Sequence, residues 1–581
     1  MSRRKPNGPV RSVRSGGSWI ALALLAIAVY LPSLGGEFLW DDNTSVTESE
    51  IVHDPGGWWK AWVAPPRSHP DYFPLTTTAF WLQWRLWGLN PVGYHCVSVL
   101  LHAGCVVLFH RLLRELKFPG AWAAAALVAV HPVNVESVAW IAEQKNLLCL
   151  IFALPSFQCF VRWHREGGVR DYRLALACHA AALAAKASVV GLPVLFAAYM
   201  IWRDGRFGRR SLKVLLPFIG LSVAFAGLVI HFQHERAVGE WQIVMPGLPG
   251  RIGGAALAFW FYLGKVVWPF PLATIYPQWN LQARLAWPLG LAFLTIGGLV
   301  ALWGLRAGRF RGLAFGLTAY GVLLGPTLGL VKMSFLRHAP VADHFQHLAL
   351  PALVGTLVVS GFMVAGQWRA QTGRRAGTIF LVGIGLWFGG LSWQRAALHG
   401  SHEALWRDAL AKNPASPQPH QMLGTIAAHR GENTSAEIRF RRAIDLGSPE
   451  ALINLGITLC NAGRFEEAIP WLQRGAAAGV NPGQAYAQWA RALVELNRTE
   501  EALGVLEEGA TRYPGNLLIN SAAGAAFVMA RQPAKALGFL ERCERLAPRD
   551  VGTKLSIAQA LEALGRGREA AEKQAEARRI Q

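Results

Sequence analysis

The sequence predicts an all-α protein in two parts: a polytopic transmembrane helical domain followed by an α-solenoid. Three observations predict it: long apolar segments within positions 1–400, basic clusters between those segments, and a regular period of small residues within positions 401–581. With 52% hydrophobic and 16% charged residues, the composition excludes a disordered chain and is unlike that of a soluble enzyme. We expect a basic N-terminal segment at 1–16, a membrane domain at 17–395 and repeats at 402–581.

The apolar segments predict about eleven membrane crossings. A crossing helix needs about 20 residues. Segment 174–201 is too long for one crossing, and Lys186 and Ser188 near its middle predict two short helices in a hairpin. The predicted segments are 17–34, 92–110, 120–140, 147–161, 174–201, 214–232, 252–270, 286–305, 312–331, 346–366 and 377–393.

The basic residues predict the orientation of these crossings. Residues 1–400 carry 35 Lys+Arg and 16 Asp+Glu, whereas residues 401–581 carry 22 and 20, so the net charge of +21 belongs almost entirely to the membrane domain. Clusters in cytoplasmic loops are the usual pattern, so a nucleic-acid surface is not needed to explain the charge. Six clusters carry it: residues 3–14, 111–117, 162–173, 203–213, 306–311 and 369–375.

All six clusters lie on one side of the membrane if segment 252–270 does not cross. We expect it to be a re-entrant or interfacial helix within an external loop spanning about 233–284, with Lys265 on it. The N-terminus is then cytoplasmic, 35–90 is the first external loop, and the repeats are external; twelve crossings would leave the repeats in the cytoplasm. Segment 17–34 is expected to be a retained signal anchor, because no small-residue cleavage site follows it.

The segment 402–581 repeats with a spacing of 32 to 34 between equivalent small residues. Such a period, with small residues where paired helices touch, resembles the tetratricopeptide repeat and predicts about five repeats with a protein-binding concave surface. A generic amphipathic helical array is the alternative. Residues 402–414, with Trp406 and Ala409, are expected to form a preceding half-repeat. The recurring small residues are Gly424, Gly456, Ala490, Gly524 and Ala558; Ala436, Ala468, Ala502, Ala536 and Ala570; and Ala443, Gly475, Gly509, Cys543 and Ala577.

The acidic residues of the external side are the first candidates for chemistry. Asp41 and Asp42 follow the first span closely, where a partly desolvated carboxylate can act as a base. Loop-capping acids are the alternative.

A polar run inside an apolar stretch contains His131, Asn134, Glu136, Glu143, Lys145 and Asn146. Ionisable groups within a membrane are functional candidates, although a water-exposed loop after Pro132 is the competing interpretation.

External cations form a third group that could hold a lipid phosphate: Lys186, Lys265, Lys332, Arg337, His338 and His344. Snorkelling to the headgroups is the alternative for each of them.

The seven Cys show no metal-ligand spacing and are expected to be buried thiols. Phosphate-cradling, GxSxG and HExxH motifs do not occur in the sequence, so soluble hydrolases and P-loop ATPases are disfavoured.

Several phrases occur in a fixed order along the chain. They are FLWDD at 38–42, YFPLTT at 72–77, GLNPVGYHCVSVLLHA at 88–103, HPVNVESVAWIAEQKNLL at 131–148, AKASVVGLP at 185–193, YLGKVVWP at 262–269 and VADHFQHLALP at 341–351. Together with the repeats, this set resembles the transmembrane and tetratricopeptide-repeat-containing family, including its bacterial relatives, over nearly the whole chain.

That resemblance implies a type C glycosyltransferase that uses a polyprenyl-phosphate sugar as donor on the external side. It implies protein O-mannosylation, with Ser/Thr hydroxyls of exported proteins as acceptors and the repeats binding the acceptor. The family's acidic motif falls on Asp41 and Asp42, and its second acidic position on Glu143 or, with a poorer match, Glu136.

An inverting displacement is the implied mechanism, with Asp41 or Asp42 as base. Lys145, Lys186, Arg337 and His344 are the expected donor-phosphate ligands, and a divalent cation could assist them. A bacterial inner membrane is the expected location, with the repeats in the periplasm.

The chain departs from the family pattern at Phe73, Gln144 and His344, where Arg is usual or frequent. These changes leave open an altered donor or an inactive member. Two other functions therefore stay open: a non-catalytic membrane-anchored scaffold, and transfer of the sugar to a glycan or lipid.

Overall fold

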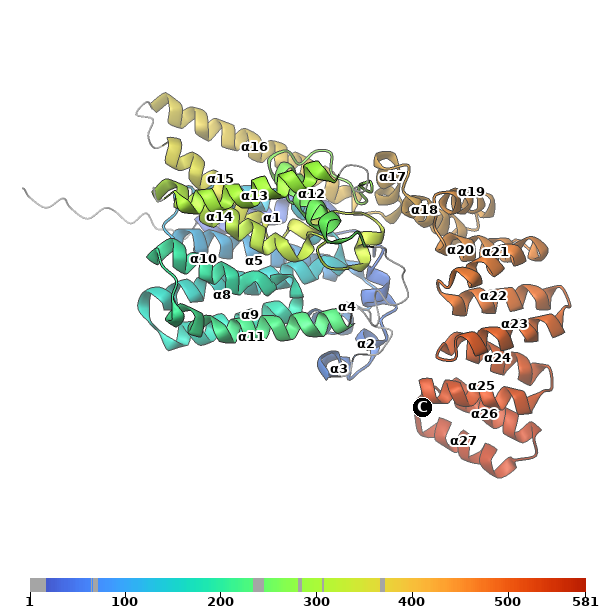
Figure 1. The fold of residues 1–581 in the computed structure, drawn as a ribbon. Coiled ribbons are helices and arrows are strands. Elements are labelled where there is room, and N and C mark those ends of the chain that lie inside the picture. The colour runs from blue at the N-terminus through green and yellow to red at the C-terminus, as the bar shows by residue number, and fades with distance from the viewer. Residues whose placement is uncertain are drawn as a thin grey trace, which may run out of the picture. The chain divides into compact units, whose positions relative to one another are not determined.

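The computed structural model describes residues 17–63, 65, 72–232, 245–280, 285–305, 308–365 and 371–580, and this part of the chain contains helices and no strand (Figure 1). The chain divides into two compact units, residues 1–412 and residues 413–581. The described part of the chain therefore has the all-α architecture that the sequence predicts.

The first unit opens with α1 (Ser18–Val29), a loop with short helices α2 (Glu50–His53) and α3 (Gly57–Val63), and α4 (Pro74–Trp87). The bundle continues through α5 (Pro91–Glu115), α6 (Ala121–Ala129), α7 (Val135–Ala139), α8 (Gln144–Glu166), α9 (Val169–Ala185), α10 (Leu192–Asp204) and α11 (Arg209–Phe232). It ends with α12 (Leu248–Val267), α13 (Ala286–Gly304), α14 (Gly308–Leu324), α15 (Leu350–Ala365), α16 (Gln371–Leu398) and α17 (His402–Lys412).

Short helical turns join several of these helices. They are Leu31–Ser33, Asn43–Thr47, Pro132–Asn134, Ile141–Glu143, Ala187–Gly191, Gly325–Thr327, Ser334–Arg337 and Asp343–Gln346. Several of the polar residues singled out above lie on these turns or directly beside them, so much of the candidate site is built from irregular backbone between helices.

Six helical segments of the described chain are long and apolar enough to cross a membrane, or seven if the bent pair α6 and 132–139 is one span. They are Pro91–Glu115, Ile141–Glu166, Ala187–Asp204, Arg209–Phe232, Ala286–Gly304 and Arg375–Leu398. This supports an integral membrane protein and does not support the predicted count of about eleven.

The shortfall has a physical reason in helix length and continuity. At 1.5 Å per residue, the 12 residues of α1 and the 16 of α15 fall short of a hydrocarbon core of about 30 Å. The predicted segment 120–140 bends by 48° where Pro132 interrupts it. The predicted break in 174–201 is present, because α9 ends at Ala185 and a short turn precedes α10.

The basic turns that follow α5, α8 and α10 lie at one end of the bundle, which we call the basic end. The turn after α5 contacts the end of α8, where Arg165 Nη1 lies 3.9 Å from Glu115 Oε1. His164 Nε2 lies 3.0 Å from Asp204 Oδ2 in the turn after α10. Figure 1 shows the α8–α9 and α10–α11 turns at this same end.

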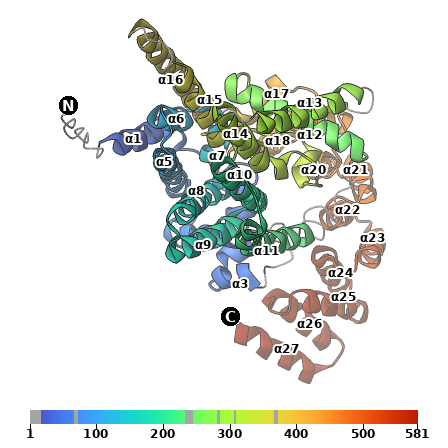
Figure 2. The same ribbon diagram turned by 60° about the vertical axis from the view of Figure 1, so that its left-hand side comes forward.

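The second unit consists of antiparallel helix pairs. The pairs are α18 (Pro417–His429) with α19 (Asn433–Asp445), α20 (Glu450–Asn461) with α21 (Phe465–Ala478), α22 (Pro482–Glu495) with α23 (Thr499–Arg512), α24 (Leu517–Met529) with α25 (Pro533–Leu546), and α26 (Val551–Ala563) with α27 (Gly567–Ile580). Figure 2 shows the pairs following one another as a solenoid.

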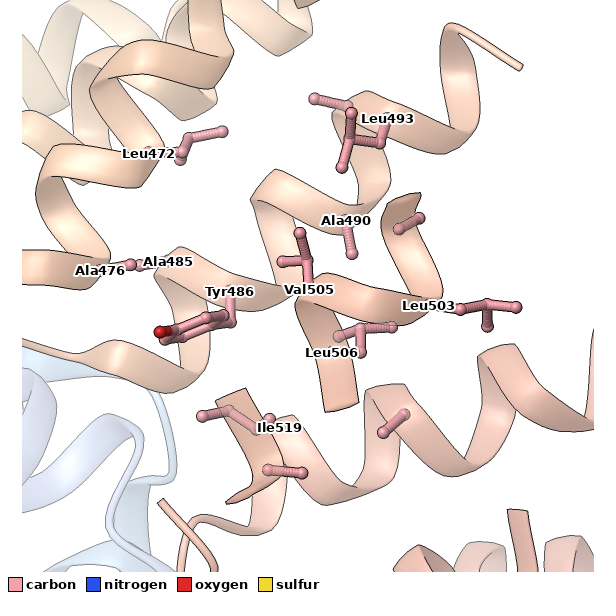
Figure 3. Close-up of a cluster of buried hydrophobic side chains, with 14 of the residues drawn as sticks. Leu472, Ala476, Ala485, Tyr486, Ala490, Leu493, Leu503, Val505, Leu506 and Ile519 are labelled. Atoms are coloured by element: carbon pink, nitrogen blue, oxygen red, sulfur yellow. The ribbon is translucent and has the colours of Figure 1, made fainter. Parts of the chain in front are cut away.

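Small residues of the repeating series lie at the contacts between these helices. A Cβ built at Gly456 would lie 2.5 Å from Leu472 Cγ, and one built at Gly524 would lie 2.5 Å from Leu540 Cδ2. Ala490 packs in the continuous core that Figure 3 shows together with Tyr486. The period thus marks close helix–helix approach, as a tetratricopeptide-type solenoid requires.

Helix α17, which the sequence places in a half-repeat, is grouped with the membrane unit instead. Trp406 on α17 is fully buried and packs edge-on against Trp40, with ring centroids 5.1 Å apart. Leu405 joins Leu39, Trp140 and Ala142 in a small core. Trp406 is buried beside the acidic loop and therefore belongs to the membrane unit, although the sequence pattern places it directly before the first repeat.

Candidate functional site

The acidic loop after α1 places Asp41 and Asp42 in opposite environments. Asp42 is fully buried; its Oδ2 accepts a hydrogen bond from Leu39 N at 2.7 Å and its Oδ1 accepts one from Ala142 N at 2.6 Å. Burial raises the pKa of the Asp42 carboxyl to about 8, although the two backbone donors and Lys145 oppose the increase. Asp41 is exposed. Asp42 thus fastens the loop to the polar run, and Asp41 faces outward.

Glu143 lies next to that fastening point and collects two cations. Its Oε1 lies 2.8 Å from Lys145 Nζ, and its Oε2 lies 3.5 Å from Lys186 Nζ. Asn146 Nδ2 donates to Glu143 Oε2 at 2.6 Å, and Lys186 Nζ donates to Asn146 Oδ1 at 2.7 Å. Two ammonium groups around one carboxylate leave a local excess of positive charge.

A second buried centre contains Glu136 and Asp343, which share one guanidinium. Arg395 Nη2 lies 2.9 Å from Glu136 Oε1 and 3.0 Å from Asp343 Oδ2. Tyr276 OH donates to Asp343 Oδ1 at 2.8 Å. Burial, and then the charge of Glu136, raise the pKa of Asp343, while Arg395 opposes the increase. Here the carboxylates outnumber the cation.

His344 connects the two centres. Its Nδ1 lies 3.0 Å from Glu136 Oε2, and its backbone N–H donates to the same oxygen at 3.2 Å. Its Nε2 lies 4.0 Å from Glu143 Oε1. An ionised carboxylate only accepts, so Nδ1 carries the proton when Glu136 is charged. The ring thus lies between the carboxylate-rich and the cation-rich centre.

Aromatic rings cover this network beside the acidic loop. Trp40 stacks on Trp140 with centroids 5.5 Å apart, and its backbone φ of 39° is unusual for a non-glycine residue. His338 packs edge-on against Trp40 at 5.3 Å, and burial lowers its pKa to about 3, so the ring is neutral. Arg337 Nε donates to His338 Nε2 at 2.8 Å, which ties Arg337 to the aromatic group.

The structure therefore gathers most of the predicted site residues. Glu136, Glu143, Lys145, Lys186 and His344 form one contact network, to which Asp42 is joined through Ala142. Asp41 adjoins the network in sequence, and Arg337 reaches its aromatic cover. His131 belongs elsewhere, because its Nε2 bonds to Val266 O at 3.0 Å.

Sequence reasoning missed Arg395, Asp343 and Tyr276 as site residues. The available signal was Arg395 itself, a single cation at the end of the apolar segment 377–393, since ionisable groups at such depths are functional candidates. Asp343 directly precedes His344, and no local pattern in the sequence marks it as a site residue.

The departures from the family pattern have different structural outcomes. His344 occupies the centre of the network. Gln144 is buried, and its Nε2 donates to Tyr94 O at 2.8 Å, while its Oε1 accepts from Gln83 Nε2 at 2.9 Å. Phe73 precedes α4, and nothing in the structure explains its identity. Gln144 is therefore a buried polar contact to α4 and α5 in this protein.

Among the described residues, no group of three or more His, Cys, Asp or Glu side chains is arranged to hold a metal ion. The carboxylates of the network bind lysine, arginine and histidine instead. In the described part of the chain, these carboxylates are therefore not arranged as metal ligands.

Together, the fold and the site define a polytopic membrane protein with a buried charged centre and a tetratricopeptide-type solenoid. Its similarity to curated proteins points to protein O-mannosyl-transferases. A protein of that name from Caenorhabditis elegans is 34% identical over 169 residues, which are 26% of this chain and 24% of the relative. Protein O-mannosyl-transferase TMTC2 of Mus musculus is 32% identical over 148 residues, 24% of this chain and 18% of the relative. The chain thus spans about a quarter or less of the length of these relatives.

No family model matches the chain. The solved structure of YrrB, a TPR protein with an unusual peptide-binding site, is similar at 16% identity, covering 30% of this chain and 92% of YrrB with a TM-score of 0.25. The assignment of the solenoid therefore depends on the helix pairs of this chain itself.

Proposed function

We propose that this protein is an integral membrane glycosyltransferase that moves a sugar, mannose or another hexose, from a polyprenyl-phosphate donor to Ser/Thr hydroxyls of exported proteins. The observation that carries the proposal is the network around Glu143, where two lysines and a histidine surround one carboxylate beside the acidic loop. The names of the similar proteins favour this chemistry over the other functions that a charged membrane site could have.

The donor phosphate has its best ligands in Lys145 and Lys186. Lys145 Nζ and Lys186 Nζ both lie beside the Glu143 carboxylate, and Lys186 Nζ also donates to Asn146 Oδ1. The side chains of Lys145 and Lys186 are 17% and 12% exposed, so both are shielded from bulk water and their charge is poorly screened. A departing phosphate between them would be stabilised at the point where its negative charge develops.

The lipid chain of the donor has a place in an apolar groove of about 1020 Å³ between α6, α12, α15 and α16. Val354, Leu357, Phe380 and Phe388 are among its lining residues, and His131 lines it next to the polar run. Isoprenoid chains bind through apolar area alone, so such a groove needs few polar groups.

Asp41 is the group that fits the role of base. Both oxygens of Asp42 accept backbone hydrogen bonds, whereas Asp41 is exposed one residue earlier. In the proposed step, the acceptor hydroxyl oxygen bonds to the anomeric carbon and its proton passes to the Asp41 carboxylate. The bond from the anomeric carbon to the phosphate oxygen breaks, and the electron pair leaves with the polyprenyl phosphate. Inversion at that carbon follows from this single displacement.

The repeats would bind the acceptor on the external side of the membrane. Basic loops of membrane proteins usually lie in the cytoplasm, so we assign the six basic clusters to that side. The residues of the charged network come after the C-terminal ends of helices such as α1 and α9, at the opposite end from these clusters. On this proposal the network and the repeats are periplasmic in a bacterial inner membrane. Dependence on a divalent cation stays a prediction that chelation of the reaction mixture tests.

The proposal is tested in a strain that lacks the gene and expresses either the wild-type protein or Asp41→Asn. Mass spectrometry of the envelope proteins measures the hexose on their peptides. We expect hexose-modified Ser/Thr peptides only with the wild type. Hexose on glycolipids alone would favour the lipid or glycan acceptor. Unchanged peptides in both strains would favour the non-catalytic scaffold.

A further inference from the structure

An apolar cavity separate from the charged network lies towards the basic end of the bundle. Its volume is about 400 Å³, and α5, α8, α10, α14 and α15 surround it. Representative lining residues are Leu113, Leu150, Leu195, Phe315 and Val359. Apolar cavities of ~150 Å³ already stay dry and take apolar ligands. A larger one inside a membrane domain is suited to a hydrocarbon chain.

The basic end closes one side of this cavity with the turn that follows α5. Leu116, Lys117, Phe118 and Pro119 all line it. The turn ends α5 with two hydrogen bonds, from Lys117 N to Arg114 O at 3.0 Å and from Phe118 N to Leu113 O at 3.0 Å. This is the Schellman pattern, in which the residue at the position of Lys117 adopts the left-handed conformation.

Lys117 stands where the backbone favours glycine. Its φ is 59°, which is disfavoured for any residue with a Cβ. The side chain is exposed at the edge of an otherwise apolar cavity. Lys117 therefore supplies a cation at the edge of an apolar cavity.

The neighbouring acid does not neutralise Lys117. Glu115 lies 3.9 Å from both Arg162 Nη1 and Arg165 Nη1 and accepts a hydrogen bond from Gln158 Nε2 at 2.7 Å. The charge beside the cavity is therefore positive, in an end of the bundle where basic residues already gather.

We propose that this cavity and Lys117 form a binding site for an anionic phospholipid of the leaflet at the basic end. One acyl chain occupies the cavity, and the headgroup phosphate pairs with Lys117. An anionic headgroup fits better than a zwitterionic one, because the surrounding turns add positive charge. That charge would repel the cationic group of a zwitterionic headgroup. The site is independent of the proposed transferase reaction, which takes place at the charged network around Glu143.

Thermal unfolding of the full-length, delipidated protein tests the site. The protein is measured in detergent alone and with phosphatidylglycerol or phosphatidylcholine of the same chain length. We expect phosphatidylglycerol to raise Tm more than phosphatidylcholine, and native mass spectrometry to show one retained phosphatidylglycerol. Inorganic phosphate alone should give no increase, which separates a lipid headgroup from a free anion.

Variants at the cavity test the binding of the headgroup and the binding of the acyl chain separately. Lys117→Gly relieves the backbone and should fold at least as well as the wild type, yet lose the difference between the two lipids. Lys117→Arg should keep that difference, and so should Arg170→Gln, a control at an exposed cation of the same end that does not line the cavity. Ala352→Phe fills the cavity and should abolish the response to both lipids.

Two results would overturn the proposal. An unchanged preference for phosphatidylglycerol in Lys117→Gly would show that Lys117 does not bind the headgroup. An unchanged lipid response in a folded Ala352→Phe protein, or in Ala319→Leu as a second cavity-filling variant, would show that the chain lies elsewhere.

Discussion

Arg395 in the membrane unit and Arg498 in the repeat unit each bind a carboxylate at under 3 Å, in very different surroundings. Arg395 Nη2 lies 2.9 Å from Glu136 Oε1, and its side chain is 7% exposed. Arg498 Nη2 lies 2.6 Å from Glu501 Oε2, and its side chain is 47% exposed. Water solvates the second pair in the folded and unfolded states alike, whereas the first pair must replace its own lost hydration. Similar distances therefore carry different energies.

The position of each pair in the sequence differs as well. Arg464 with Glu467, Arg498 with Glu501, and Arg566 with Glu569 recur at the same position of their repeats, each at the start of a second repeat helix. Arg395 and Glu136 are 259 residues apart and occur once. A repeating local pair belongs to the architecture of the solenoid. A single distant pair in a buried centre belongs to a site.

Removing Arg395 is expected to have the largest effect. Arg395→Gln leaves Glu136 and Asp343 buried with one cation fewer, which costs about 3–5 kcal/mol in comparable buried pairs. Thermal unfolding of the purified protein measures it. Arg395→Lys should recover part of the loss, because it restores charge without the guanidinium fork. A variant Arg395→Gln as stable as the wild type would show that the centre is hydrated and the pair unimportant.

Overpacking the solenoid is expected to have the next largest effect. In Gly524→Val the new side chain meets Leu540 at the contact of α24 and α25, and such overpacking costs about 1–3 kcal/mol. Gly538→Ala is the matched control, since nothing lies within 4 Å of its Cβ position and α25 should gain stability. Chemical unfolding of both variants checks the order. Equal stability of the two variants would contradict the assigned helix contact.

Asp42 should give the membrane unit a stability that falls with pH. Its pKa is raised to about 8 in the folded protein and is near 4 in the unfolded chain. Between these values the folded state holds more protons, so unfolding becomes easier as pH rises from about 4 to about 8. Asp42→Asn should flatten this slope in Tm measured against pH. Asp343 contributes in the same direction, so part of the slope remains. A steeper slope in Asp42→Asn would contradict the assignment.

The exposed pair is expected to have the smallest effect. Arg498→Gln should leave Tm nearly unchanged at physiological salt, because screening and side-chain entropy offset the attraction. The corresponding position of the fourth repeat already carries Gln532. A loss of Tm similar to that of Arg395→Gln would remove the distinction between the two kinds of pair.

The two regions also differ in how much of them the sequence could predict. In the repeats, the contact partners of a residue lie in the same repeat or the next, so the period of small residues locates the contacts of Gly456 and Gly524. In the membrane unit, the polar run containing Glu136 and Glu143 was visible as an interruption of apolar sequence. Its partners Arg395 and Asp343 belong to much later segments of the chain, and no local pattern connects such distant positions.

The predicted span count was less successful for a related reason. Hydropathy locates apolar sequence but does not show where a helix ends. Pro132 bends one predicted crossing, and α1 and α15 end before they reach the length of a bilayer core. The sequence does not distinguish Asp41 from Asp42, whereas the structure does, by the burial of Asp42 and by its hydrogen bonds from Leu39 N and Ala142 N.

Sugar transfer by the purified protein in proteoliposomes tests the central claim most directly. The donor is a polyprenyl-phosphate hexose, the acceptor is a Ser/Thr peptide, and the product is read by mass spectrometry. We expect transfer by the wild type, a loss of at least about 100-fold in Asp41→Asn and in Lys186→Gln while both proteins stay folded, and near wild-type transfer in the distant control Arg498→Gln. Transfer that persists at the wild-type rate in both Asp41→Asn and Lys186→Gln would contradict the account.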